Sequence, residues 1–324
     1  MTRDHFNKQF FDMMKLKNLF IVCAMAASCL TSPTWAHSEG NYVHSDFFET
    51  MKTGDKAALL MVHFGTTHDD TRALTIEAIN EKARALFPNL EFREAYTSRI
   101  VMNRLAKRGV DKKNPIEALA QLKADGYTHV LIQSTNIIDG IEMESLRKDI
   151  NQMKDLFKEI RLGAPLLYAP EDYKQVIEIL AKKGGKKGEM TLLVGHGTYT
   201  PATAQYAMLD YMLQAEGHTD FAVTTVEGYP ALDDAINRIE GRKGVKKIQL
   251  LPFMFVAGDH AKNDIAGDIR QALEAKGYEV SVLLEGLGQN PEIQNIFIDH
   301  ARFMTKHRLV DITDKKKAYA ADKE

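Results

Sequence analysis

The chain has 324 residues, of which 44% are apolar and 27% are charged, and its formal net charge is −2. This balance is typical of a folded globular protein and excludes an intrinsically disordered chain. The sequence also lacks the basic excess of a protein that binds a phosphate backbone, so we expect no nucleic acid partner. The length is sufficient for two medium-sized domains, each with its own core.

The first 36 residues have the features of a secretory signal. Lys15 and Lys17 precede an apolar run over 19–30, and small residues then lead to Ala36. This order predicts a signal peptide at 1–36, cleaved after Ala36, and a periplasmic protein. A buried N-terminal helix and a lipoprotein signal that is acylated at Cys29 are the two alternatives.

Both cysteines, Cys23 and Cys29, lie within this segment. Cleavage after Ala36 would leave a mature chain without cysteine, so a metal site in it must use nitrogen and oxygen ligands. Residues 37–55 are predicted to form an N-terminal arm, and residues 311–324 a polar tail.

From Lys56 onward, apolar strand-like runs alternate with amphipathic helical stretches. In the first half we predict strands at 57–64, 92–97 and 129–137, with helices at 70–87 and 114–125. In the second half we predict strands at 190–197, 221–228, 247–258 and 280–288, followed by a helix at 291–306. Strands separated by helices predict parallel sheets with helices on both faces.

The two halves resemble each other. Residues 59–67 are similar to 192–200, where a hydrophobic strand runs into a Gly-Thr turn, and 129–142 are similar to 247–260. The sequence therefore predicts an α/β protein with two Rossmann-like lobes, whose parallel sheets face a central cleft. We place the lobes at 56–187 and 188–310, with the Lys- and Gly-rich stretch 182–188 as the linker.

Four polar residues follow predicted strands, where ligands bind in open α/β sheets. His196 stands in a Gly-His-Gly context, whose bare backbone would let a ligand approach closely. Glu227 ends a strand, His260 follows Val-Ala-Gly-Asp, and Glu142 is the counterpart of His260 in the first half. Two imidazoles and a carboxylate suit Co²⁺, Fe²⁺, Ni²⁺ or Zn²⁺, and three protein ligands leave coordination positions open.

Each of these residues also has an ordinary structural interpretation. A histidine at a strand end is often only hydrogen-bonded. Glu227 could cap the segment that follows it, and Glu142 could begin a helix together with Glu144. His63 could belong to the site or be a buried residue with its hydrogen bonds satisfied. The neighbours of the other histidines indicate surface positions without a role in the site: His68, His129, His218, His300 and His307.

Several common catalytic motifs are absent from the sequence. It contains no P-loop, no G-x-G-x-x-G fingerprint and no G-x-S-x-G elbow. We therefore expect no nucleotide partner, no nicotinamide chemistry and no serine hydrolase.

The chain resembles the anaerobic sirohydrochlorin cobaltochelatases, which are relatives of the class II chelatases that include ferrochelatase. The resemblance covers essentially the whole mature chain. Its most specific parts are the Gly-His-Gly of VGHGTYTPATAQYAMLDYM (194–212) and the run LLPFMFVAGDHAKNDIAGD (250–268). It also extends over 59–71, 95–110, 116–142, 226–230 and 286–297.

The resemblance implies a chelatase-like fold around a tetrapyrrole cleft, and insertion of Co²⁺ into sirohydrochlorin without a nucleotide. By position, His196 would be the main metal ligand and proton acceptor, and His260 the second histidine ligand. Glu227 is the preferred carboxylate ligand, with Glu142 as a proton relay or alternative ligand. The resemblance leaves a homo-oligomer open.

This chain departs from the family pattern at two positions. It has His63 where a small Ser is expected, and Asn136 where several relatives have His. Together with the signal peptide, Asn136 supports a second hypothesis, that the protein is a periplasmic carrier of haem, another tetrapyrrole or a metal. A third hypothesis is a ferrochelatase-type enzyme that inserts Fe²⁺.

Overall fold

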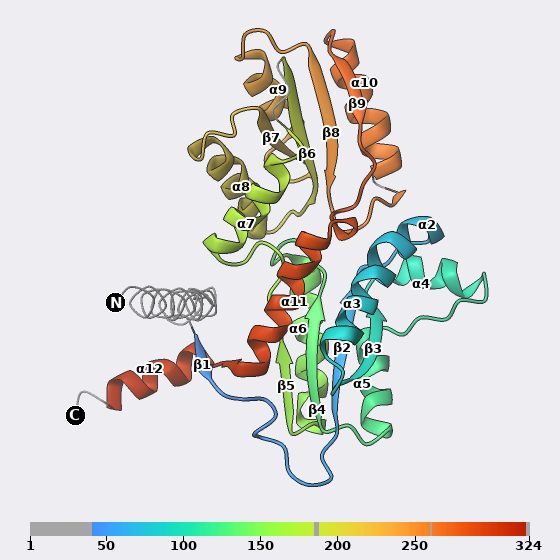
Figure 1. Cartoon of the computed structure of the whole chain (residues 1–324), viewed down its shortest axis with the longest axis vertical. Helices are drawn as coiled ribbons and strands as arrows, with labels where there is room; N and C mark the ends of the chain where they lie inside the picture. Colours follow the sequence, from blue (N-terminus) through green and yellow to red (C-terminus); the bar gives the residue numbers. More distant parts are fainter. Residues whose placement is uncertain (1–40, 185–187, 260, 322–324) are drawn as a thin grey trace, which may run out of the picture. The chain divides into compact units, whose positions relative to one another are not determined.

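Two parallel four-stranded sheets organise the computed structural model, which describes residues 41–184, 188–259 and 261–321 (Figure 1). Three of the sequence-based predictions lie outside the described residues: the signal peptide with Cys29 and Ala36, part of the linker, and the ligand His260.

The first sheet is built around a strand that is buried along its whole length. This strand, β2, is apolar in six of its seven positions, which suits a strand covered by helices on both faces. The order across the sheet is β3 (Glu91–Tyr96), β2 (Ala57–His63), β4 (His129–Ser134) and β5 (Glu159–Leu162). Its connections contain α2 (Asp69–Arg72), η2 (Ala73–Glu77), α3 (Ala78–Leu86), α4 (Arg99–Ala106), α5 (Pro115–Ala124), α6 (Ile141–Met153), η3 (Lys154–Leu156) and α7 (Pro170–Ala181).

The second sheet repeats this strand order. It consists of β7 (Phe221–Glu227), β6 (Glu189–Gly197), β8 (Lys247–Phe253) and β9 (Glu279–Val282). Its helical segments are η4 (Pro201–Thr203), α8 (Ala204–Ala215), α9 (Leu232–Glu240), η5 (Ala261–Ile269), α10 (Arg270–Ala275), η6 (Leu287–Gln289) and α11 (Pro291–Lys306). The α/β class with two similar parallel sheets is therefore confirmed.

Three predicted strands extend at least three residues beyond the observed ones, and the one predicted at 129–137 ends at Ser134. The strand predicted at 247–258 ends at Phe253, because Met254, Phe255 and Val256 bend away from the sheet and line a cavity. The strand predicted at 280–288 ends at Val282, and 287–289 form a short helical turn instead.

One hydrophobic core joins the two sheets. Helix α11 follows the second sheet in sequence but packs against β4 and β5 of the first, and α7 packs against α8 (Figure 1). Tyr173 of α7 and Phe297 of α11 belong to the same buried cluster as Leu59 of β2 and Leu193 of β6. This shared core fixes the two sheets relative to each other.

The predicted arm and tail both contain regular structure. The short strand β1 (Tyr42–His44) pairs antiparallel with β10 (His307–Leu309), and α12 (Ile312–Ala321) follows it. The buried Arg161 guanidinium holds this end by donating to the carbonyls of Ser45, Met304 and His307 at 2.6, 2.8 and 3.0 Å. None of the helices in the described part of the chain is long and apolar enough to cross a membrane.

Candidate active site

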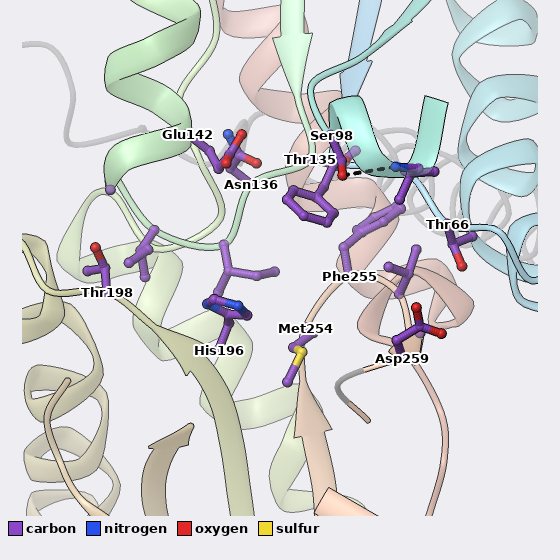
Figure 2. A pocket seen from close by; sticks show the side chains of 18 of the residues that line it. Thr66, Ser98, Thr135, Asn136, Glu142, His196, Thr198, Met254, Phe255 and Asp259 are labelled. Carbon is purple, nitrogen blue, oxygen red and sulfur yellow. Dashed lines mark hydrogen bonds between the residues drawn. The ribbon is translucent and has the colours of Figure 1, made fainter. Parts of the chain in front are cut away.

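A cavity of about 450 Å³ lies at the carboxyl ends of the strands of both sheets (Figure 2). Segments that follow β2, β3 and β4 form one side of it, and the ends of β6, β7 and β8 form the other. Much of the lining is apolar, including Phe64, Ile100, Ile138, Phe253, Met254 and Phe255. Apolar walls with a few polar groups are typical of a site for a large, flat organic ligand.

His196 and Glu227 meet on the second-sheet side of this cavity. They end the neighbouring strands β6 and β7, and His196 Nδ1 lies 3.5 Å from Glu227 Oε1. The Nδ1–H of His196 donates to the carbonyl of Gly197 at 3.1 Å, which assigns the tautomer whose Nε2 carries the lone pair. Both side chains are about half exposed, at 43% and 51%, so a ligand in the cavity can reach them.

The glycines beside His196 also leave room for neighbouring protein atoms, and Gly197 lines the cavity. A Cβ on Gly195 would lie 2.3 Å from the ring of Tyr206, and one on Gly197 would lie 1.6 Å from the carbonyl oxygen of Glu227. Gly197 also has φ of 86°, which L side chains rarely adopt. The missing side chains therefore admit these protein atoms, and they allow β6 and β7 to bring His196 and Glu227 together.

Glu142 and Asn136 line the cavity from the first-sheet side (Figure 2). Glu142 is in the first turn of α6, where the positive end of the helix dipole stabilises a carboxylate. Asn136 lies after β4, and its Nδ2 is buried without a hydrogen-bond partner within the described residues. The structure thus places Glu142 across the cavity from His196, while Glu227 is its direct neighbour.

His63 is a buried structural residue and does not line the cavity. It is 1% exposed, with Nε2 2.9 Å from Asn80 Oδ1 and Nδ1 3.0 Å from Thr135 Oγ1. Asn80 Nδ2 donates to Glu94 at 2.9 Å, so Asn80 Oδ1 accepts from His63 Nε2–H, and Nδ1 accepts from Thr135. Burial lowers the pKa of His63 to about 4, so the ring is neutral near pH 7.

Three residues at the cavity rim were not assigned a role from the sequence. Asp259 accepts hydrogen bonds from His68 Nε2 at 2.8 Å and from Arg104 Nη1 at 2.9 Å. Both contacts lower the pKa of the Asp259 carboxyl group, and the hydrogen bond from His68 has the larger effect. His68 and Arg104 belong to the first half of the chain, so the pair of contacts holds the turn that precedes His260 against the opposite side of the cavity.

Two other expectations for histidines are wrong. His129 and His300, predicted at the surface, are 1% and 2% exposed. His300 Nε2 contacts Asp172 at 3.0 Å, so a polar partner inside the core compensates its burial.

The predicted metal ligands are brought together only in part. Within residues 41–184, 188–259 and 261–321, no group of three or more His, Asp or Glu side chains is assembled to hold a metal ion. His196 and Glu227 form a two-residue pair that can bind a borderline divalent ion with nitrogen and oxygen. His260, the third predicted ligand, is not among the described residues.

Comparisons with known proteins identify the family of the chain. A family model described as cobalt chelatase (CbiK) matches residues 57–305. The sirohydrochlorin cobaltochelatase of Salmonella typhimurium strain LT2 is 37% identical over 252 residues, which are 76% of this chain and 95% of that protein. The sirohydrochlorin cobaltochelatase CbiKC of Nitratidesulfovibrio vulgaris strain Hildenborough is 31% identical over 255 residues, which cover 76% of this chain and 89% of that protein.

Two solved structures share the fold. SirB from Bacillus subtilis with Fe³⁺ superposes with a TM-score of 0.56 at 15% identity, over 77% of this chain and 96% of its own. The sirohydrochlorin chelatase SirB from Bacillus subtilis subspecies spizizenii, in complex with cobalt, gives 0.53 at 14% identity over 77% and 95%. These likenesses show the fold, while the family model and the two sequence relatives show that the chain belongs to the cobalt chelatase (CbiK) family.

Proposed function

We propose that this chain is a sirohydrochlorin cobaltochelatase, which inserts Co²⁺ into the macrocycle without a nucleotide. The observation that carries the proposal is the His196–Glu227 pair at the side of a large apolar cavity, in a chain of the cobalt chelatase family. The apolar walls suit the faces of the macrocycle, and the paired imidazole and carboxylate suit the metal substrate.

Metal insertion requires two pyrrole N–H protons to leave while the ion loses water. A neutral imidazole can accept a proton through its unprotonated nitrogen, and His196 Nε2 is the atom assigned to this step. Glu227 lies beside the other ring nitrogen and can stabilise the imidazolium that results. A cavity with apolar walls also strengthens these electrostatic interactions.

The three proposed ligands for the incoming Co²⁺ are His196, Glu227 and His260. His196 Nε2 has a single lone pair, so it releases the ion to the macrocycle before it accepts a pyrrole proton. Glu142 approaches from the opposite side of the cavity and is proposed as a relay for the second proton. Ligands on one side and a base on the other would let the macrocycle lie between them, with one proton leaving toward each face.

The experiment is an insertion assay with sirohydrochlorin and Co²⁺, followed by absorbance, on the purified protein and on His196→Ala. We expect loss of insertion in the variant with the fold intact. His218→Ala is the matched control, because that partly exposed ring packs edge-on against Phe221 and does not line the cavity. A rate in His196→Ala equal to that of the parent protein would refute the assignment.

The same assay distinguishes the other two hypotheses. Faster insertion of Fe²⁺ than of Co²⁺ would favour a ferrochelatase-type enzyme. Saturable haem binding by folded protein, without insertion of either metal, would favour the tetrapyrrole carrier.

We further propose that the protein is exported to the periplasm and cleaved after Ala36. The support is the sequence pattern of Lys15, Lys17 and the apolar run over 19–30. Mass spectrometry of the protein from fractionated cells should find an N-terminus at His37 in the periplasmic fraction. An acylated N-terminus at Cys29 in the membrane fraction would support the lipoprotein alternative, and an intact leader in the cytoplasmic fraction would contradict export.

A further inference from the structure

We propose that His44 and His307 form a second binding site for a divalent cation, at the paired strands β1 and β10 and outside the cavity. The proposal does not depend on the proposed function, because neither residue lines the cavity. Its support comes from strand register, ring orientation and the surrounding charges.

The strand register places the two side chains as close together as an antiparallel pair allows. His44 and His307 are direct partners in the β1–β10 ladder. The flanking backbone bonds are Ser45 N–H to Lys306 O at 2.9 Å and Val310 N–H to Asn41 O at 2.6 Å. Hydrogen-bonded and non-hydrogen-bonded pairs alternate along such a ladder, so His44 and His307 occupy a non-hydrogen-bonded pair, where side chains approach most closely.

The His307 ring is already held in one orientation. It stacks on Phe303, with ring centres 4.0 Å apart and planes at 10°, and its Nδ1–H donates to the carbonyl of Phe303 at 3.1 Å. A hydrogen bond from one ring nitrogen to a backbone carbonyl is the usual arrangement behind a metal-binding histidine, because it fixes the tautomer and leaves the other nitrogen as the ligand. Nε2 is therefore the ligand atom that His307 offers.

The spacing of the two rings is close to that of a shared metal ion. The ring centres of His44 and His307 are 5.7 Å apart. Two imidazoles that bind one ion at about 2.1 Å with a tetrahedral angle have their centres roughly 5.2 Å apart. The two ring planes stand at 86°, and His44 is exposed, so rotation of its side chain can turn a ring nitrogen toward an ion held by His307.

The charges near the pair are compensated. Lys306 is paired with Asp46, and the Arg161 guanidinium is paired with Glu159 and bonded to backbone carbonyls. Arg308 is the next residue of β10, and by strand alternation it belongs to the opposite face. His307 directly follows α11, whose C-terminal end carries the negative end of the helix dipole and favours a cation.

Two imidazoles select borderline ions such as Ni²⁺, Co²⁺, Cu²⁺ or Zn²⁺ over Mg²⁺ or Ca²⁺. Water would fill the remaining coordination positions. An ion bound here would cross-link β1 to β10, and since the unfolded chain does not hold the two rings together, binding should stabilise the folded protein.

The test uses Ni²⁺ alone as the probe, on the tag-free protein carrying His196→Ala, Glu227→Gln and His260→Ala to remove the three proposed cavity ligands. Equilibrium dialysis of this background protein should find one Ni²⁺ site. Adding His44→Ala or His307→Ala should lower its affinity at least tenfold, and adding His218→Ala should not. The melting temperature should rise with Ni²⁺ in the background protein and not in the His44→Ala version.

His307→Ala could disturb the end of α11, whereas His44 is exposed and its replacement by alanine should leave the fold intact. The His44→Ala variant therefore tests the proposal by itself. Absence of Ni²⁺ binding by the background protein up to millimolar concentration would overturn the proposal. Equal Ni²⁺ affinity with and without His44 would overturn it as well, because the remaining site would then lie elsewhere.

Discussion

Asp259 Oδ1 lies 2.8 Å from His68 Nε2, although the two residues are 191 positions apart in the sequence. Arg104 Nη1 donates to the other carboxylate oxygen of Asp259 at 2.9 Å. One carboxylate thus receives two donors from across the cavity. Asp259 immediately precedes His260, so the conformation of this turn bears directly on the proposed ligand set.

We predict that Arg104→Met lowers kcat/KM for Co²⁺ insertion by about tenfold and leaves stability nearly unchanged. Arg104 and Asp259 are 57% and 50% exposed, and an ion pair of this kind contributes about 0.2–1 kcal/mol. Insertion kinetics and urea unfolding measure the two effects separately. Arg108→Met is the matched control, because that arginine pairs with Asp69 and is absent from the cavity lining. Insertion at the parental rate would contradict a positioning role for Arg104.

The two carboxylates of the cavity should give different kinetic signatures. Glu227 is 3.5 Å from the ring of His196, so Glu227→Gln should raise the KM for Co²⁺ at least tenfold through loss of a charged ligand. Glu142 acts from the other side in the proposed mechanism, so Glu142→Gln should lower kcat and change the KM for Co²⁺ little. Steady-state rates over a range of Co²⁺ concentrations measure both. If Glu142→Gln raised the KM for Co²⁺ and Glu227→Gln lowered kcat instead, Glu142 would be the metal ligand and Glu227 the proton relay.

Much of the fold could be predicted because local signals agreed with the final packing. The run 57–64 is apolar at every position except His63, as a strand buried on both faces requires, and β2 covers Ala57–His63. The Asn-Pro pair at 114–115 marked the start of α5, where Asn114 and Glu117 cap each other's backbone. By contrast, β5 has only four residues, two of them charged, and gave no strand signal because Arg161 is buried through long-range hydrogen bonds.

The sheet against which α11 packs could not be predicted, for a different reason. An amphipathic pattern shows that one face of a helix is buried but does not identify the sheet that buries it. The same limit applies to the site, because a local sequence pattern does not identify the distant residues that a side chain contacts. Topology placed His196 and Glu227 at neighbouring strand ends, whereas the contacts of His63 with Asn80 and Thr135 depend on segments that no local pattern connects to it.

His63 should make stability depend on pH. Its pKa is lowered to about 4 by burial, from 6.5 for an ordinary histidine. Between these values the unfolded state binds a proton and the folded state does not, so stability falls as the pH falls from about 6.5 to 4. The full effect is on the order of 3 kcal/mol.

Urea unfolding at a series of pH values tests this, with His63→Gln for comparison. The variant keeps a donor and an acceptor but does not titrate, so its free energy of unfolding should change less over this range. Parallel curves for the two proteins would show that another group causes the pH dependence.

Gly197→Ala should damage both stability and activity, and Gly217→Ala separates the two causes. The glycines have nearly the same φ, 86° and 88°, and an alanine in this region costs about 1–2 kcal/mol. A Cβ on Gly217 meets nothing within 4 Å, whereas one on Gly197 would lie 1.6 Å from the carbonyl oxygen of Glu227. Gly217→Ala should therefore show the backbone cost alone, with normal Co²⁺ insertion.

Gly197→Ala must in addition push β6 away from the end of β7, since a strand carbonyl cannot move aside as the end of a flexible side chain can. Its loss of stability should clearly exceed that of Gly217→Ala, and its KM for Co²⁺ should rise as Glu227 moves away from His196. Urea unfolding and insertion kinetics on both variants measure these effects. Equal losses of stability would mean that the sheet absorbs the extra methyl group, and the close approach of the two strand ends would then not be what brings His196 and Glu227 together.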